Sequence, residues 1–335
     1  MSDTVTLPTK GMLEAMSNAK LGDDVFREDP TVIELEDKMA AIFGMEAGLY
    51  CPSGTMCNQI AIKMHTQPMD EMLCDIHSHV YQFEVGGYSF LSQIAVNPLQ
   101  GNCGILSADI IKENIKDKRD WLPITKLVVL ENSGNRSGGN CYSLQQLQEI
   151  SQICRNENLN LHLDGARIFN ALLAKKITAN SIGPLFDSIS ICLSKGLGAP
   201  VGSVLIGKKK WIDECRRIRK VLGGGMRQVG ILAAAGIYAL DNNIDRLSED
   251  HHRAKRIEQI LMKQNYVESV IPVETNIVIF NLKNSILPAQ FVDHLKTAGV
   301  NSSAFGKQSI RFVTHLDITE QMIDELEIIL SSIVQ

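Results

Sequence analysis

Three charged side chains that could act together follow two strand-like apolar segments. Asp164 and Arg167 come after the segment 160–163, in the run Leu-His-Leu-Asp-Gly-Ala-Arg. Lys195 comes after the second segment, 189–193, in the run Ser-Lys-Gly-Leu-Gly-Ala-Pro. If the two segments are neighbouring parallel strands, their carboxyl ends lie side by side, where open α/β sheets bind ligands. The sequence therefore predicts a pocket that holds an acid, an arginine and a lysine.

These three groups are typical of an enzyme that uses pyridoxal phosphate (PLP). Lys195 offers a primary amine that can form a Schiff base with the cofactor aldehyde. Asp164 would keep the ring nitrogen protonated, so that the ring accepts the electrons of a carbanion at the substrate Cα. Arg167 would hydrogen-bond the ring oxygen or a substrate carboxylate. A Ser-Lys-Gly run alone is more typical of a surface loop, and the preceding Asp-Gly-Ala-Arg motif favours the catalytic interpretation.

A group of small and polar residues could bind the phosphate of such a cofactor. Ser53, Gly54 and Thr55 precede a helix-like stretch at 58–64. The amino terminus of a helix binds anions through its free N–H groups and its dipole. The tripeptide alone is more typical of a simple helix cap. Its occurrence together with the lysine motif favours a phosphate site.

His77 and His79 are two residues apart and would project from one face if their segment is a strand. Such a pair can bind a metal ion, but the neighbouring sequence offers no third or fourth ligand. We therefore expect no metal site. The glycine-rich run at 196–202 misses the spacing of a dinucleotide-binding loop and has no acidic partner, which argues against an NAD-binding module.

The chain as a whole resembles the low-specificity L-threonine aldolases, PLP enzymes of the aspartate-aminotransferase fold type, fold type I. Single motifs of this resemblance are weak, but together they span nearly the whole chain in order. They are Gly-Asp-Asp-Val-Phe-Arg-Glu-Asp-Pro (22–30), Pro-Ser-Gly-Thr-Met (52–56), Asn-Arg-Ser-Gly-Gly (135–139), Asp-Gly-Ala-Arg-Ile-Phe-Asn-Ala (164–171), Gly-Gly-Gly-Met-Arg-Gln (223–228) and Ile-Arg-Phe-Val-Thr-His (310–315).

The resemblance implies roles for further residues. His79 corresponds to a histidine that stacks on the PLP ring and assists catalysis with Lys195 and Asp164. Ser2, Arg167 and Arg311 would bind the substrate carboxylate. Arg227 would lie close to the phosphate, at an interface between subunits. The family is commonly tetrameric, so the resemblance also implies a homo-oligomer built as a dimer of dimers.

One departure from the family pattern concerns the substrate side of the site. Relatives usually carry Glu-Asn-Thr-His-Asn, whereas this chain has Gly134 in place of the histidine. We expect Gly134 to face the β-carbon of the substrate and to leave a roomier pocket. The identity of the base that takes the β-hydroxyl proton is therefore open, and a water molecule held by His79 is one candidate.

The elements that must position these residues alternate along the chain. Short strands are predicted at 126–130, 160–163, 189–193 and 203–206, the last antiparallel, with helices at 31–43 and 144–153. This alternation predicts an α/β fold, a mostly parallel sheet covered by helices. From about residue 243 the pattern changes to that of a small α+β unit. We therefore predict a large PLP-binding domain, 1–242, and a small carboxyl-terminal domain, 243–335.

The composition excludes several other classes of protein. Of the 335 residues, 44% are hydrophobic and 21% charged, as in ordinary globular proteins. The net charge of −5 gives no basic surface for nucleic acid. No apolar run could span a membrane, and the first residues lack a secretory signal. The eight cysteines form no Cys-x-x-Cys pair, which predicts reduced thiols and a cytoplasmic location.

The leading hypothesis is a lyase that splits L-threonine or L-allo-threonine into glycine and acetaldehyde. A first alternative is another PLP reaction on a β-substituted amino acid, either β-elimination or cleavage of a bulky β-hydroxy amino acid. A second alternative is a PLP-binding homologue with little turnover. The presence of Asp164, Arg167, Lys195 and Arg311 argues against the second alternative.

Overall fold

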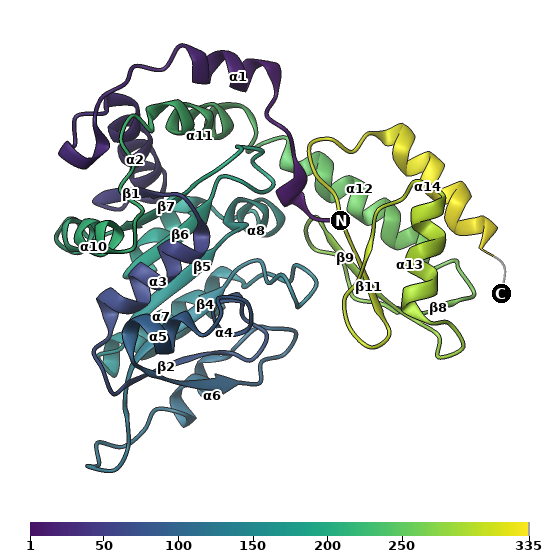
Figure 1. The fold of residues 1–335 in the computed structure, drawn as a ribbon. Coiled ribbons are helices and arrows are strands. Elements are labelled where there is room, and N and C mark those ends of the chain that lie inside the picture. The colour runs from purple at the N-terminus through teal and green to yellow at the C-terminus, as the bar shows by residue number, and fades with distance from the viewer. Residues whose placement is uncertain (334–335) are drawn as a thin grey trace.

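A computed structural model describes residues 1–333 and contains two β-sheets (Figure 1). The larger sheet has seven strands in the order β1-β7-β6-β5-β4-β2-β3. Strand β7 runs antiparallel to both of its neighbours, and the other neighbouring pairs are parallel. The strands are β1 (Ala47–Cys51), β2 (Asp70–Asp75), β3 (Ala95–Leu99), β4 (Ile124–Glu131), β5 (Asn160–Gly165), β6 (Ser188–Cys192) and β7 (Ser203–Gly207).

Helices cover both faces of this sheet, as an α/β fold requires. The longer ones are α1 (Lys10–Ser17), α2 (Pro30–Phe43), α3 (Gly54–His65), α7 (Leu144–Asn156), α8 (Ile168–Lys175), α10 (Lys209–Val221) and α11 (Gly230–Asn242). The shorter ones are α4 (His79–Gln82), α5 (Gly87–Ser92), α6 (Ala108–Glu113) and α9 (Ala179–Ile182). The mostly parallel, helix-covered sheet and the antiparallel strand at 203–206 are thereby confirmed.

The two faces of β5 and β6 differ in polarity because alternate residues point to opposite sides. The apolar residues belong to the largest hydrophobic core: Leu161, Leu163, Ile189 and Ile191. The polar residues of the other face hydrogen-bond side chains of α3: His162, Asp164, Ser188 and Ser190. Helix α3 therefore lies against a polar strip of the sheet at the point where Asp164 emerges.

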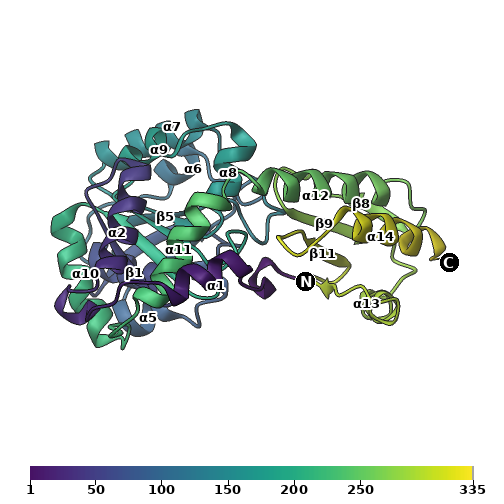
Figure 2. The same cartoon turned by 90° about the horizontal axis from the view of Figure 1, so that it is seen from above.

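The smaller sheet is antiparallel, with the strand order β10-β11-β9-β8. Three helices pack with it around a hydrophobic core of its own (Figure 2). These elements are α12 (Leu247–Leu261), β8 (Val267–Val270), β9 (Ile277–Leu282), α13 (Pro288–Thr297), β10 (Ser303–Ala304), β11 (Ser309–Val313) and α14 (Glu320–Ser332). The predicted domain boundary falls in the short connection between α11 and α12.

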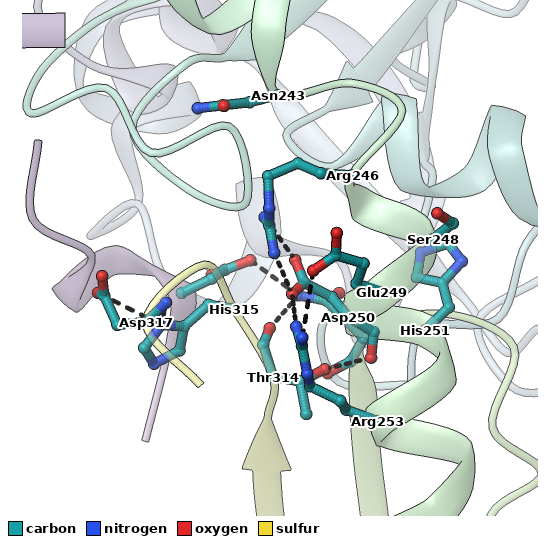
Figure 3. A network of polar contacts seen from close by, with 12 residues as sticks. Asn243, Arg246, Ser248, Glu249, Asp250, His251, Arg253, Thr314, His315 and Asp317 are labelled. Atoms are coloured by element: carbon teal, nitrogen blue, oxygen red, sulfur yellow. Dashed lines mark hydrogen bonds and ion pairs between the residues drawn. The ribbon is translucent and has the colours of Figure 1, made fainter. Parts of the chain in front are cut away.

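Polar contacts connect the start of α12 to both sheets, and Figure 3 shows those around Asp250 and Thr314. The Asn243 side chain donates to the carbonyl of Leu197, in the loop that follows Lys195, over 2.7 Å. The Arg246 guanidinium donates twice to the Asp250 carboxylate, over 2.7 and 3.1 Å. Thr314, just after β11, donates to the carbonyl of Asp250 over 2.7 Å. These contacts therefore fix the loop that follows Lys195 relative to the end of β11.

The amino-terminal residues cross from α1 to the smaller sheet (Figures 1 and 2). The terminal amine of Met1 donates to the carbonyl of Asn301 over 3.0 Å. Residues Asp3–Val5 form a short 3-10 turn, in which Asp3 is fully buried. This segment therefore lies between the two sheets.

The structure bears on two predictions from composition. All eight cysteines are free thiols, as predicted. Among the helices of residues 1–333, none is long and apolar enough to cross a lipid bilayer.

Candidate active site

A cavity of about 180 Å³ opens where the two sheets meet. Its lining includes five residues that the sequence singled out: Ser2, His79, Arg167, Lys195 and Arg311. The remaining lining residues are Thr4, Glu131, Asn135 and Ala166. Residues from both ends of the chain and from both sheets therefore meet at one place.

Asp164 and Lys195 come from adjacent parallel strands, as the sequence predicted. Asp164 is 3% exposed, and its Oδ1 atom accepts the backbone N–H of Ala166 over 3.1 Å. Its Oδ2 atom accepts the side-chain amide of Asn58 over 2.8 Å. Because both donors are neutral, the carboxylate remains free to pair with a cationic ligand.

His79 begins helix α4, so the segment with His77 is not the strand that the spacing suggested. Strand β2 already ends at Asp75, and His77 is exposed. The Nδ1 atom of His79 lies 3.0 Å from the Glu84 carboxylate. Burial alone would lower the pKa of His79, but the Glu84 hydrogen bond and the Asp164 charge outweigh burial and raise that pKa.

Arg167 is paired with a residue that the sequence analysis did not single out. Its Nε and Nη2 atoms donate to the two carboxylate oxygens of Asp3, over 2.6 and 2.7 Å. Burial opposes ionisation of Asp3, but the guanidinium charge outweighs it and lowers the pKa of Asp3 to about 2. On either side of Asp3, Ser2 and Thr4 line the cavity, and their hydroxyl oxygens are 3.0 Å apart.

Arg311 enters the cavity from β11. Its Nη1 atom donates to the side-chain oxygen of Asn135 over 2.7 Å, and its guanidinium lies 4.4 Å from the ring centre of Phe305. Its Nε atom is buried and has no hydrogen-bond partner among residues 1–333. Burial and, secondarily, the Arg167 charge lower the pKa of Arg311 to about 10. A carboxylate ligand would satisfy both the charge and the unpaired donor.

The proposed phosphate loop forms the amino terminus of α3. The Ser53 hydroxyl caps this helix by accepting the backbone N–H of Met56 over 3.2 Å. Gly54 packs so closely that a Cβ atom there would lie 2.6 Å from the sulfur of Cys192, the last residue of β6. Thr55, the next residue, is exposed. The helix terminus therefore lies beside the strand end that leads to Lys195.

Arg227 is exposed and does not line the cavity of a single chain. Its Nη1 atom donates to the Asp23 carboxylate over 2.9 Å. Within one chain, the charge of Arg227 is therefore already paired with an acid.

Gly134 does not meet the expectation that it faces the substrate. It lines a separate, much smaller cavity together with Asp75, His77 and Ser137. A Cβ atom at this position would lie 2.1 Å from the hydroxyl of Ser137. A side chain at position 134 would therefore meet Ser137.

Glu131 is a cavity residue that the sequence analysis missed. It ends β4 and is in register with Asp164 on β5, a position that the strand pattern could have indicated. Its two carboxylate oxygens accept the backbone N–H groups of His79 and Asn135, each over 2.8 Å. Burial, followed by the neighbouring Asp164 charge, raises the pKa of Glu131 to about 7. Glu131 can therefore exchange a proton near neutral pH.

Potential metal ligands do gather near Asp164. Ligand atoms of His79, Glu84 and Asp164 lie within 4.8 Å of one another. Glu84 lies just after α4, and Asp164 lies near the end of β5. The side-chain amide of Asn58 donates to both carboxylates, over 2.8 and 2.9 Å. The two carboxylates therefore share one neutral donor.

The residues present fit PLP. Lys195 supplies the amine, and Asp164 supplies a buried carboxylate whose hydrogen-bond donors are neutral. At the start of α3, a Cβ on Gly54 would occupy the space beside Cys192 and the Ser203 hydroxyl. That hydroxyl is buried and has no partner within residues 1–333. Lys195, Asp164, His79 and Ser53–Thr55 are thus the residues that would hold the cofactor.

Comparison with known proteins agrees with this geometry. The model of the beta-eliminating lyase family matches residues 1–285. The low specificity L-threonine aldolase of Escherichia coli is 40% identical over 326 residues, which are 97% of this chain and 96% of that protein. The low-specificity L-threonine aldolase 1 of Arabidopsis thaliana is 38% identical over 325 residues, which are 95% of this chain and 91% of that protein.

The fold is also that of a solved relative. The structure of a threonine aldolase from Leishmania major superposes with a TM-score of 0.86 at 19% identity, covering 99% of this chain and 98% of that one. The chain belongs to the low-specificity L-threonine aldolases within the beta-eliminating lyases, and it is a PLP-dependent lyase of fold type I.

Proposed function

We propose that the chain cleaves L-threonine and L-allo-threonine to glycine and acetaldehyde by breaking the Cα–Cβ bond. The observation that carries this proposal is that Arg311, whose guanidinium has no carboxylate partner among residues 1–333, lines the same small cavity as Lys195. A cavity of about 180 Å³ suits a small amino acid. The resemblance to named threonine aldolases over nearly the whole chain supports the same substrate class.

Lys195 is the amine that would bind the cofactor covalently. When bound, PLP supplies an electron sink for the charge that develops at the substrate Cα. Asp164 would hold the proton on the ring nitrogen, because a buried carboxylate with neutral donors favours a cationic partner. His79, beside Asp164 at the cavity, would pack against the ring.

The substrate carboxylate would bind Arg311, with Ser2 and Arg167 beside it. Because Arg167 already donates two hydrogen bonds to Asp3, Arg311 has the larger free donor capacity. A fixed carboxylate fixes the direction of the Cα–Cβ bond relative to the cofactor, and that direction selects which bond breaks.

Glu131 and His79 are the titratable groups that could take the β-hydroxyl proton, directly or through a water molecule. Glu131 lines the cavity and has a pKa of about 7, close to the value that suits a general base at neutral pH. Its backbone donors, the N–H groups of His79 and Asn135, would keep its carboxylate in place.

The alternative reaction is a β-elimination, which the match to the beta-eliminating lyase family favours. Incubation of the PLP-loaded protein with L-threonine and analysis of the products separates the two. Acetaldehyde and glycine support the proposal. Ammonia and 2-oxobutanoate from L-threonine, without acetaldehyde, would replace it with β-elimination. Lys195→Ala is the control and should form neither set.

We also propose that the protein acts as a homo-oligomer, a dimer of dimers, in the cytoplasm. The resemblance to the low-specificity L-threonine aldolases supports an oligomer, and the exposed position of Arg227 is compatible with a place at an interface between subunits. Sedimentation analysis tests the assembly, and a monomer with full activity would contradict it.

A further inference from the structure

A buried row of polar side chains connects Asp164 to the far end of α3. It comprises His65 and Asn58 from α3, His162 from β5 and Ser188 from β6. Asn58 and His65 are seven residues apart, so they lie on the same side of the helix. All four are buried, and the described lining of the Lys195 cavity includes none of them. Any effect of this row on the reaction must therefore pass through the two carboxylates that Asn58 contacts, Asp164 and Glu84.

The hydrogen bonds of Asn58 fix the direction of its amide. Its nitrogen lies 2.8 Å from Asp164 Oδ2 and 2.9 Å from Glu84 Oε1. Ionised carboxylates only accept hydrogen bonds, so the NH₂ group must face them. The amide oxygen then faces His162 Nε2 at 3.1 Å and the Ser190 hydroxyl at 2.5 Å. Both of these groups must donate to it.

The same argument fixes the protons of the two histidines. Burial lowers the pKa of His162 to about 4 and that of His65 to about 3, so both rings are neutral at pH 7 and each carries one N–H. His162 must carry its proton on Nε2, which leaves Nδ1 to accept the Ser188 hydroxyl over 2.8 Å. The Ser188 oxygen can then accept His65 Nε2–H over 2.8 Å.

We propose that His65, Ser188, His162 and Asn58 form a relay of neutral hydrogen-bond donors that all point toward Asp164 and hold its carboxylate in one orientation. Neutral donors stabilise a buried negative charge without adding a cation that would compete with a protonated ring nitrogen. Asn58 also joins Asp164 to Glu84, the partner of His79. These four are positioning residues, and their effect on threonine cleavage rests on the proposed function.

The direction of the relay can be measured without turnover. Nitrogen-15 NMR of the histidine rings in the PLP-loaded protein distinguishes Nδ1–H from Nε2–H, and His162→Gln and His65→Gln assign the two signals. We expect both rings to be neutral with the proton on Nε2. A proton on Nδ1 of His162, or an imidazolium at pH 7, would overturn the proposal.

Two amide variants on α3 test the link to Asp164. Asn58 and Gln59 both donate to Glu84, but only Asn58 also donates to Asp164. Asn58→Ala should raise the dissociation constant of PLP about tenfold or more, on the scale of one hydrogen bond to a charged group. It should also release the His162 proton from Nε2, because the acceptor is gone. Gln59→Ala should change neither measurement.

Equal effects of Asn58→Ala and Gln59→Ala on PLP binding and on the His162 proton would refute the relay. A product assay separates this failure from that of the proposed function. If the histidine protons and the variants behave as expected but threonine is not cleaved, the relay holds and the substrate assignment is wrong. If threonine is cleaved but the His162 proton lies on Nδ1, only the relay is wrong.

Discussion

Asp3 and Arg167 form a buried, two-point ion pair between the amino terminus and the end of β5, with N–O distances of 2.6 and 2.7 Å. The Asn276 side chain, next to β9 of the smaller sheet, also donates to Asp3 over 3.2 Å. One carboxylate therefore connects the amino-terminal segment to both sheets. Because Ser2 and Thr4 flank it and line the cavity, this pair also shapes the substrate side of the site.

Asp3→Asn should destabilise the protein and raise KM for threonine. Removal of one partner of a buried ion pair typically costs about 3 kcal/mol, because the remaining charge stays buried without compensation. Urea unfolding and steady-state kinetics measure the two effects. Asp23→Asn, which breaks the more exposed pair with Arg227, is the control and should change stability little. Equal losses in both variants would contradict the special role of Asp3.

Arg311→Lys should weaken the binding of glycine and threonine while PLP stays bound. Lysine keeps the charge but loses the planar set of donors, including the unpaired Nε. We expect KM to rise about tenfold or more, the scale of one lost charge-assisted hydrogen bond. Arg136→Lys is the matched control, because Arg136 contacts the same Phe305 ring but does not line the cavity. Loss of PLP from Arg311→Lys would instead assign this arginine to the cofactor.

At saturating PLP, Asp164→Asn should lose most of the cleavage activity. An amide cannot hold a protonated ring nitrogen as a carboxylate does, so the electron sink weakens when charge develops. We expect kcat to fall about a hundredfold or more, which is the usual scale for removing one such electrostatic group. The control is Asp75→Asn, which changes another buried carboxylate, at the end of β2, that accepts only the backbone N–H groups of His77 and Gly101. Turnover within about threefold of the wild type would exclude the role of Asp164.

Glu131 should make stability depend on pH in the slightly acidic range. Its pKa is raised from 4.5 to about 7, so the folded state binds a proton that the unfolded state releases. This contribution is complete below about pH 4.5 and is lost as the pH rises toward about 7. Glu131→Gln should flatten the pH dependence of the urea midpoint across this window. An unchanged profile would show that Glu131 does not titrate there.

The parts of the fold that the sequence predicts are those with strong local patterns. The apolar strands before Asp164 and Lys195 lie side by side as expected, since both are fully buried runs with clear ends. Two histidines at alternate positions fit a strand, but no strand forms at 77–79. Strand β2 ends at Asp75, and a short helix starts at His79.

Contacts between remote parts of the chain could not be predicted in this way. Asp3 and Arg167 are separated by 164 positions, and no local pattern of either residue indicates the other. The relay behind Asp164 is easier to anticipate from the sequence, because polar and apolar residues alternate in β5 and β6. That alternation indicates a polar face, but only the packing of α3 shows that Asn58 and His65 complete it.

Gly134 provides a test of the loop that follows β4. The Ser137 hydroxyl donates to the carbonyl of Gly134 over 3.2 Å, and it occupies the space that a Cβ at position 134 would need. Gly134→Ala should therefore displace this hydroxyl and cost about 1 kcal/mol, the value of one hydrogen bond. The ratio of activities toward L-threonine and L-allo-threonine should stay the same, because position 134 does not line the Lys195 cavity.

A double-mutant cycle isolates this contact. In a Ser137→Ala background the obstructing oxygen is absent, and the nearest remaining atom, the Ser137 Cβ, lies at 3.4 Å from the added methyl. Gly134→Ala should then cost clearly less than in the wild type, with a coupling of about 1 kcal/mol measured by urea unfolding. Additive effects would mean that the two positions do not touch. A changed preference between the two substrates would mean that position 134 reaches the reacting carbon after all.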